Sequence, residues 1–142
     1  ARTTTDRAVI SVTVTPEVES QLRDLPVDVG VAVYHVARES VANALRHGAP
    51  ATIDIRVGLA GDELIMHVAD DGNGFDPASA EKDGRAMGLF QMRERIALLN
   101  GKVEIVSAPQ QGTDVRVRVP VSLGRRAVPR LEANEMENQH AR

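Results

Sequence analysis

The sequence predicts an α/β sandwich, in which helices pack on one face of a mixed, mostly antiparallel sheet. Alternating apolar segments come in pairs joined by short turns, and two segments with helical apolar spacing are interspersed with them. Of the 142 residues, 42% are hydrophobic and 26% charged, as in a soluble globular domain. We place one domain at residues 1–123 and expect residues 124–142, which are poor in apolar side chains, to form a disordered tail.

The N-terminal part contains a strand and two helices. Residues 7–14 alternate as a strand does, and residues 16–26, which begin and end with proline, suit a short helix. Residues 28–46 have the spacing of a longer helix, with Asp28 as a suitable N-cap and Gly48 as a suitable stop. The apolar positions that define this helix are Val33, Val36, Ala37, Val41, Ala44 and Leu45.

The C-terminal part contains two hairpins and a second helix. Residues 51–60 and 63–70 alternate around a Gly-Asp turn. Residues 76–87 are small and polar and form a loop long enough to be functional. Residues 89–100 form an amphipathic helix, and residues 102–121 form a closing hairpin.

The composition excludes several classes of function. The net charge is −3 and the chain has no cysteine, so nucleic acid is not an expected partner and thiolate metal sites are excluded. No apolar segment approaches the roughly 20 residues that cross a bilayer. We therefore expect no direct membrane contact and a cytoplasmic location, whether or not a parent protein is anchored. The first residue is Ala1 rather than methionine, which suggests a fragment of a longer protein.

An acidic pair and two glycines, in the segment DDGNG, follow the strand at 63–70. An Asp-Gly pair is a strong turn signal, so a plain hairpin turn is one interpretation. The other is a ligand site, where Gly72 and Gly74 let the backbone come close to a polar ligand that the pair Asp70 and Asp71 holds.

A polar stripe follows the longer helix. Glu39, Asn43 and His47 are spaced by four residues, a step of about 40° around a helix, and His35 precedes them by one step. The stripe lies at the edge of the apolar face, which suits either a solvated surface or the wall of a cleft. Zinc is a poor candidate because His35 and His47 lie about 18 Å apart along the helix. A Mg²⁺ ion needs only one amide or carboxylate oxygen besides phosphate oxygens.

Three motifs together resemble the ATP-binding catalytic domain of sensor histidine kinases, which has the GHKL or Bergerat fold. The asparagine box of the class that pairs with NarL-type response regulators is similar to YHVARESVANALRHG. Its first glycine box is similar to DDGNGFD, and its second glycine box with the following helix is similar to MGLFQMRERIALLNG. The resemblance covers roughly residues 27–121 and disfavours the plain-turn interpretation of DDGNG.

The resemblance implies a role for each site residue. Asp70 would accept a hydrogen bond from the adenine amino group, supported by the hydroxyl of Thr113. Asn43 would bind Mg²⁺ together with the triphosphate, and Glu39 would be the catalytic residue that polarises water or the acceptor. Residues 76–87 would form the ATP lid. The other ATP-binding positions implied are Arg46 and His47 for phosphate, Gly72 and Gly74 for close backbone approach, and Gly88 and Leu89 for amides at a helix start.

The resemblance also implies the reaction, which is transfer of the γ-phosphoryl group of Mg-ATP to a histidine on a separate dimerisation domain, with a response regulator downstream. None of the histidines in this chain precedes an acidic residue, as the acceptor typically does, so we expect negligible autophosphorylation by the chain alone. The second glycine box has Ala86 where the class usually has glycine, which would stiffen the lid or crowd a phosphate.

Two other functions stay open at this point. A stand-alone serine kinase of the anti-sigma-factor type has the same pocket in a domain of this size, and transfer to serine rather than histidine would distinguish it. A non-catalytic scaffold with a decayed pocket predicts no nucleotide binding.

Overall fold

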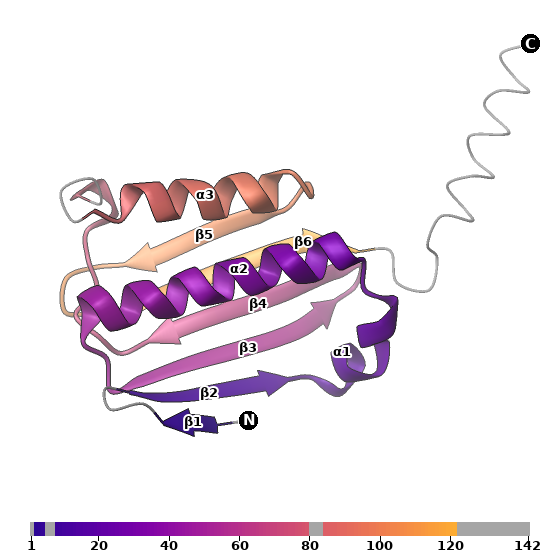
Figure 1. Ribbon diagram of the computed structural model, residues 1–142, viewed down its shortest axis with the longest axis horizontal. Coiled ribbons are helices and arrows are strands. Elements are labelled where there is room, and N and C mark those ends of the chain that lie inside the picture. Colours follow the sequence, from indigo (N-terminus) through magenta and orange to yellow (C-terminus); the bar gives the residue numbers. More distant parts are fainter. Residues whose placement is uncertain (1, 5–7, 80–83, 122–142) are drawn as a thin grey trace, which may run out of the picture.

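The computed structural model describes residues 2–4, 8–79 and 84–121, and Figure 1 shows their arrangement. The predicted tail at 124–142 and residues 80–83 of the predicted lid lie outside this part of the chain. The strands are β1 (Arg2–Thr4), β2 (Val9–Val14), β3 (Thr52–Ala60), β4 (Glu63–Asp70), β5 (Lys102–Ser107) and β6 (Thr113–Pro120). The helices are α1 (Pro16–Gln21), α2 (Val27–Asn43) and α3 (Ala86–Ala97), with 3-10 turns at Leu22–Asp24 and Pro77–Ser79 and a π-helical turn at Ala44–Gly48.

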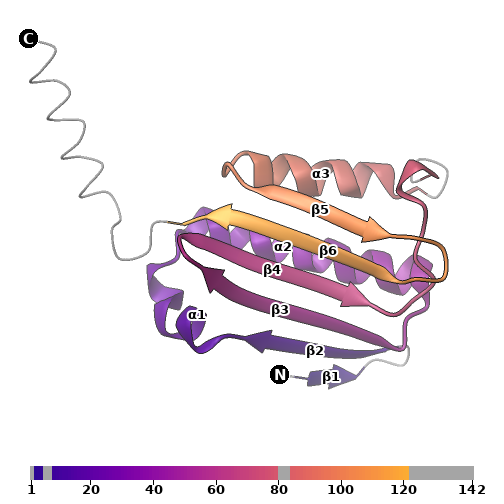
Figure 2. The same ribbon diagram turned by 180° about the vertical axis from the view of Figure 1, so that it is seen from behind.

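The strands of this part form one sheet in the order β1-β2-β3-β4-β6-β5. Only β2 and β3 pair in parallel, so the predicted mixed, mostly antiparallel sheet is confirmed. Helices α2 and α3 lie in front of the sheet in Figure 1 and behind it in the reversed view of Figure 2, and both therefore cover the same face. Within the described ranges, no helix has the length and apolar character needed to cross a bilayer.

The core lies between this face and the two helices. Alternate residues of the central strands point toward the helices, which is the pattern that the sequence shows. Those buried are Ile53 and Ile55 of β3, Leu64, Met66 and Val68 of β4, and Val115, Val117 and Val119 of β6. The opposite face carries ion pairs such as Arg56–Asp54 and Arg116–Asp114, so it stays in water.

The buried residues of helix α2 are Val29, Ala32, Val36 and Ser40. Of the apolar positions that define the predicted helix, Val36 and Ala44 are buried, while Val33, Ala37, Val41 and Leu45 are only partly buried. Ser40 is buried, its hydroxyl donates to the carbonyl of Val36 at 2.7 Å, and it lies 3.7 Å from the sulfur of Met92 on α3. A serine can occupy this apolar position because its hydroxyl is satisfied within its own helix. Ser40 thereby contributes to the contact between α2 and α3.

Both helices begin earlier than the sequence predicts. The cap position of α2 is Pro26, whose carbonyl accepts the N–H of Gly30 at 3.2 Å, so Asp28 lies in the first turn and is not the N-cap. Proline fits there because its fixed φ is compatible with helix entry. Helix α3 begins at Ala86 rather than residue 89. Strand β1, which the sequence does not predict, adds only three residues to the edge of the sheet.

Candidate functional site

A pocket lies where the end of α2 and the start of α3 meet the ends of β4 and β6. The predicted site residues that line it are Asn43, Asp70, Gly74, Leu89 and Thr113. They come from distant parts of the sequence, and the pairing of β4 with β6 brings Asp70 opposite Thr113. The other predicted residues do not line this pocket, and their positions are described below.

Asp70 is the half-buried carboxylate of this pocket. Its Oδ1 accepts the N–H of Gly72 at 2.9 Å, and the backbone N–H of Thr113 also donates to the carboxylate. Burial raises the pKa of Asp70 above its ordinary value, and these hydrogen bonds oppose the rise only in part. A carboxylate fixed by backbone donors and partly removed from water is well suited to accept one further polar hydrogen.

The hydroxyl of Thr113 does not make the contact to Asp70 that the sequence predicts. It lies 2.9 Å from the hydroxyl of Ser107, which in turn donates to the carbonyl of Gly112 and accepts the N–H of Phe75, both at 2.9 Å. Because Ser107 uses its only proton on Gly112, Thr113 is the donor in the hydroxyl pair. Ser107, which the sequence gives no reason to select, thus connects the β5–β6 hairpin to the segment after Gly74.

Asp71 has a different role from Asp70. Its Oδ1 accepts the N–H groups of Thr52 and Ala51, each at 2.9 Å, and its Oδ2 accepts the Thr52 hydroxyl at 3.1 Å. The hydrogen bond from the Thr52 backbone is the largest cause that lowers the pKa of Asp71. The interpretation that both acids hold one ligand is therefore wrong, since Asp71 fixes the start of β3 and only Asp70 lines the pocket.

Gly72 and Gly74 pack closely against backbone. A Cβ on Gly72 would meet the carbonyl of Gly48, and a Cβ on Gly74 would meet the carbonyl of Ala108. Gly74 also has a φ of +63°, which disfavours any residue with a side chain. The two glycines allow this segment to pack against the helical turn at the end of α2 and against the β5–β6 turn. This packing requires glycine at both positions whether or not a ligand binds nearby.

Glu39, Asn43 and Arg46 form a group at the rim. A terminal nitrogen of Arg46 donates to Oδ1 of Asn43 at 3.2 Å and lies 3.5 Å from Oε1 of Glu39. The first turn of α3 lies against Glu39, because a Cβ on Gly88 would meet its carboxylate. Since Arg46 is 59% exposed, these contacts are weak and a stronger partner could replace them.

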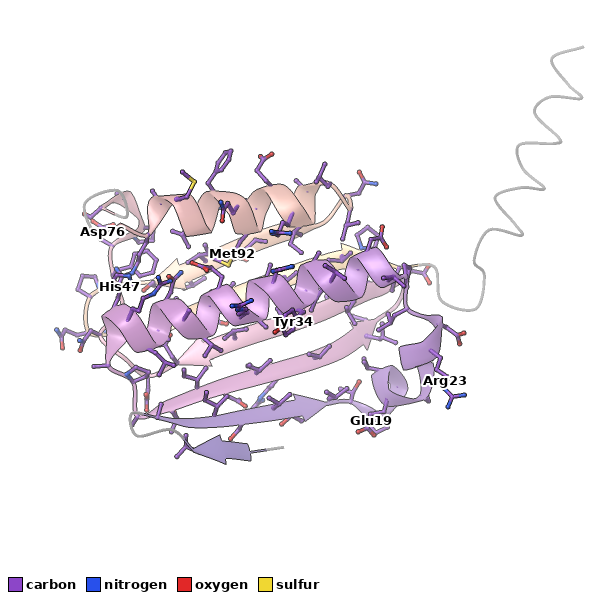
Figure 3. The ribbon with its side chains drawn as sticks, in the orientation of Figure 1. Glu19, Arg23, Tyr34, His47, Asp76 and Met92 are labelled. Carbon is purple, nitrogen blue, oxygen red and sulfur yellow. The ribbon has the colours of Figure 1, made fainter. Side chains whose placement is uncertain are left out.

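His47 lies beyond the main pocket. The helix changes to π-helical hydrogen bonding at residues 44–48, which alters the step between successive side chains. His47 therefore lines a separate surface hollow with Asn73 and Asp76, and Figure 3 shows His47 and Asp76 at the same end of the molecule. This hollow adjoins the main pocket, because both are lined by Gly74.

Leu89 contributes its side chain, rather than its amide, to the pocket. Its side chain is buried, and its N–H donates to the carbonyl of Arg85 at 3.1 Å. The amides that precede it, from Ala86 to Gly88, occupy the first turn, where a helix has no partners of its own for its N–H groups.

Two further residues of the pocket are not predicted by the sequence. Phe75 and Arg85 are each 7% exposed, and the guanidinium carbon of Arg85 lies 4.3 Å from the centre of the Phe75 ring. The free space left in the pocket is about 20 Å³. A lone arginine before a helix has no feature that predicts burial, since arginine is usually exposed.

The residues of the site suit a Mg²⁺ ion whose coordination is completed by phosphates better than they suit a metal ion held by protein ligands alone. In residues 2–4, 8–79 and 84–121, no three His, Asp or Glu side chains gather closely enough to hold a metal. Asn43 offers one amide oxygen beside an acid, the kind of donor set that Mg²⁺ uses when phosphates complete its coordination.

This fold and site define a nucleotide-binding α/β sandwich, and comparison with known proteins gives the family. The chain belongs to the histidine kinase-, DNA gyrase B- and HSP90-like ATPase family, whose model matches residues 28–123. Membership in an ATPase family implies that the chain binds ATP.

Two similar proteins are named as histidine kinases. The chain is 39% identical over 94 residues to the signal transduction histidine-protein kinase/phosphatase DegS of Bacillus subtilis (strain 168), covering 66% of the chain and 24% of DegS. It is 35% identical over 95 residues to the oxygen sensor histidine kinase NreB of Staphylococcus carnosus (strain TM300), covering 67% of the chain and 27% of NreB. The chain thus spans about a quarter of the length of each relative, and the predicted resemblance to sensor histidine kinases is confirmed.

The fold is also found among solved structures. The histidine kinase domain of the Erythrobacter litoralis EL346 blue-light activated histidine kinase superposes with a TM-score of 0.66 at 19% identity. The match covers 82% of this chain and 53% of that one. At this identity the likeness supports the α/β sandwich fold alone.

Proposed function

We propose that this chain is the nucleotide-binding catalytic domain of a two-component sensor histidine kinase. It binds Mg-ATP and presents the γ-phosphoryl group to a histidine on a separate dimerisation domain. The observation that supports this most is the position of Asp70, a half-buried carboxylate held by two backbone N–H groups in a pocket that Asn43 also lines.

Asp70 recognises the base in this proposal. The adenine amino group donates to the carboxylate, which Gly72 and Thr113 already orient. A hydrogen bond to a charged acceptor contributes about 1.5–3 kcal/mol. The apolar side chain of Leu89 supplies part of the surface against which a flat base packs.

Asn43 and the residues near it hold the triphosphate end. The Oδ1 of Asn43 would bind Mg²⁺ after Arg46 releases it, and Arg46 would then be available to a phosphate oxygen. Bound Mg²⁺ neutralises charge on the phosphates. His47 and the first-turn amides of α3 would contact the phosphates.

Glu39 is the residue that we assign to catalysis. It lies next to Asn43 on α2 and contacts both Arg46 and the first turn of α3, so it lies beside the proposed phosphate positions. In that place its carboxylate would polarise the attacking group of the acceptor, while the other residues position the phosphate.

The partners follow from the family. The phosphoacceptor histidine would lie on the dimerisation domain of the same kinase, and a response regulator, which the resemblance predicts to be NarL-type, would receive the phosphoryl group. The anti-sigma-type serine kinase is not favoured, because both curated relatives are named as histidine kinases.

Calorimetric titration with ATP, with and without Mg²⁺, tests the assignment of the pocket. We expect Asp70→Asn to weaken ATP binding about 10- to 100-fold, from the loss of a charged hydrogen bond. We expect Asn43→Ala to remove the effect of Mg²⁺. Asp62→Asn, in the exposed β3–β4 turn, is the matched control. Equal binding by Asp70→Asn and the unchanged chain would reject the base-binding role.

A further inference from the structure

We propose that Arg85 closes the nucleotide pocket from within, and that ATP binds only after this side chain has left. The inference rests on the proposed nucleotide-binding function of the pocket, and it adds a residue that controls entry. The sequence motifs place Arg85 within the predicted ATP lid at residues 76–87, but neither they nor the family match assigns a role to its side chain.

The burial of Arg85 is the first observation. An arginine is almost never buried without compensation, because removing a cation from water is costly. Here Arg85 is 7% exposed and its guanidinium stacks on the Phe75 ring at 4.3 Å. It is also near enough to Asp70 to act on that carboxylate as a favourable charge. The ring and the acid both help to compensate the buried cation.

The place of Arg85 is the second observation. Its side chain lines the same pocket as Asp70, Asn43 and Thr113 and therefore borders the space that the proposal assigns to the base. The remaining volume, about 20 Å³, is room for roughly one water molecule. A site for a drug-sized ligand needs about 300–1,000 Å³. A base therefore has no room beside Asp70 while Arg85 stays.

The backbone around Arg85 allows the side chain to leave. Arg85 lies between Gly84, which has a φ of +74° with open space where a Cβ would point, and Ala86, the first residue of α3. A side chain just before a helix start can change rotamer without breaking the helix. In the exchange Asp70 gives up a guanidinium neighbour and gains a neutral hydrogen-bond donor, the amino group of the base.

The consequence is competition between Arg85 and the ligand. When only the open fraction of the protein binds, the apparent dissociation constant is the intrinsic one divided by that fraction. A desolvated cation–π contact favours the closed state by a factor of about 5–30. Removing the side chain should tighten binding by that factor. The gain should apply to adenosine as well as to ATP, because the competition concerns the base.

The test compares Arg85→Ala and Arg85→Gln with the unchanged chain, using calorimetry with ATP and with adenosine. Arg93→Ala, an exposed arginine on α3, is the matched control. Two Arg85 variants are used so that a folding defect in one, detected by circular dichroism, does not decide the result. We expect both to bind ATP and adenosine about 5- to 30-fold more tightly, with Arg93→Ala unchanged.

Other outcomes overturn the inference in distinguishable ways. Weaker ATP binding by both Arg85 variants would mean that Arg85 contacts the nucleotide instead of excluding it. Unchanged binding would mean that the closed state is not populated. If the unchanged chain and every variant fail to bind either ligand, the proposed function itself fails, and the inference fails with it.

Discussion

Two adjacent aspartates, Asp70 and Asp71, have opposite effects on stability because their surroundings differ. Asp70 is half-buried in the pocket, and burial raises its pKa. Asp71 is exposed, and the backbone hydrogen bond from Thr52 is the main cause that lowers its pKa. The sequence shows two identical residues side by side, and only their burial and the hydrogen bonds that each accepts distinguish them.

Asp70→Asn should raise the free energy of unfolding at neutral pH while it weakens ATP binding. A carboxyl whose folded-state pKa is raised stabilises the fold below its ordinary pKa, and this stabilisation is lost as pH rises through the raised value. At pH 7 the ionised Asp70 therefore costs stability, and the neutral amide avoids that cost. Urea unfolding of both proteins at pH 4 and pH 7 should show the difference mainly at pH 7. A lower stability of Asp70→Asn at pH 7 would contradict this.

Asp71→Asn should have the reverse effect. A lowered folded-state pKa gives stability that is present above the ordinary value of 3.8 and lost as pH falls through the lowered value. We expect a loss of about 1 kcal/mol at pH 7, reduced by solvent exposure, and a smaller difference below pH 3. The same urea titrations measure it. A loss of stability in Asp71→Asn that grows as the pH falls would contradict a stabilising role of the ionised Asp71 carboxylate.

Gly74→Ala should destabilise the fold by about 2 kcal/mol or more. The φ of +63° alone costs roughly 1–2 kcal/mol for a residue with a Cβ, and the contact with the Ala108 carbonyl adds to this. Gly61→Ala is a matched control, because Gly61 has a φ of +62° but open space around it. Thermal unfolding measures the loss of stability in each variant, and the difference between the two losses gives the cost of the contact with the Ala108 carbonyl. Equal losses would show that this contact is unimportant.

At the scale of elements, the hydroxyl of Ser107 joins the β5–β6 hairpin to the segment after Gly74. Ser107→Ala removes three hydrogen-bonded contacts and leaves the N–H of Phe75 without its acceptor. We expect about 2 kcal/mol of destabilisation. We also expect faster amide exchange at Phe75, measured by hydrogen–deuterium exchange. Ser11→Ala, on β2, is the control. If exchange at Phe75 is unchanged, the connection does not hold this segment.

The elements themselves could be largely predicted because periodicity reports which face is buried. The alternation in β3, β4 and β6 and the helical spacing in α2 and α3 come directly from residues that face the same core. The helix starts were wrong by one to three residues, since a start depends on hydrogen bonds such as Gly30 to Pro26, which local composition indicates only weakly. The sequence does not predict strand β1, because its three residues are too few to show an alternating pattern of apolar and polar side chains.

The candidate site, like the fold, could be predicted from the sequence only in part. The predicted site residues carry the motif chemistry, and the structure gathers them in or around one pocket. The groups that hold them include Ser107, whose hydroxyl pairs with that of Thr113 and accepts the N–H of Phe75, 32 residues away in the sequence. No local pattern encodes such a contact, because it arises only when the sheet brings β4, β5 and β6 together.

At the scale of the whole molecule, the described residues form a two-layer sandwich of helices on one sheet (Figure 1). The candidate pocket is lined by residues from the end of α2, the start of α3 and the paired ends of β4 and β6. The chain spans about a quarter of the length of DegS and of NreB. We therefore expect the chain to bind ATP alone but to transfer phosphate only when the acceptor domain is supplied.

The central claim is tested most directly by incubating the chain with labelled ATP, Mg²⁺ and a dimerisation domain that carries the proposed acceptor histidine. The account predicts acid-labile, base-stable label on that domain, as phosphohistidine requires, and negligible label on the chain alone. It also predicts that Glu39→Gln slows the transfer more than it weakens ATP binding, while Asp62→Asn changes neither. Label that is stable to acid, or no label although ATP binds and the acceptor domain is folded, would contradict the account.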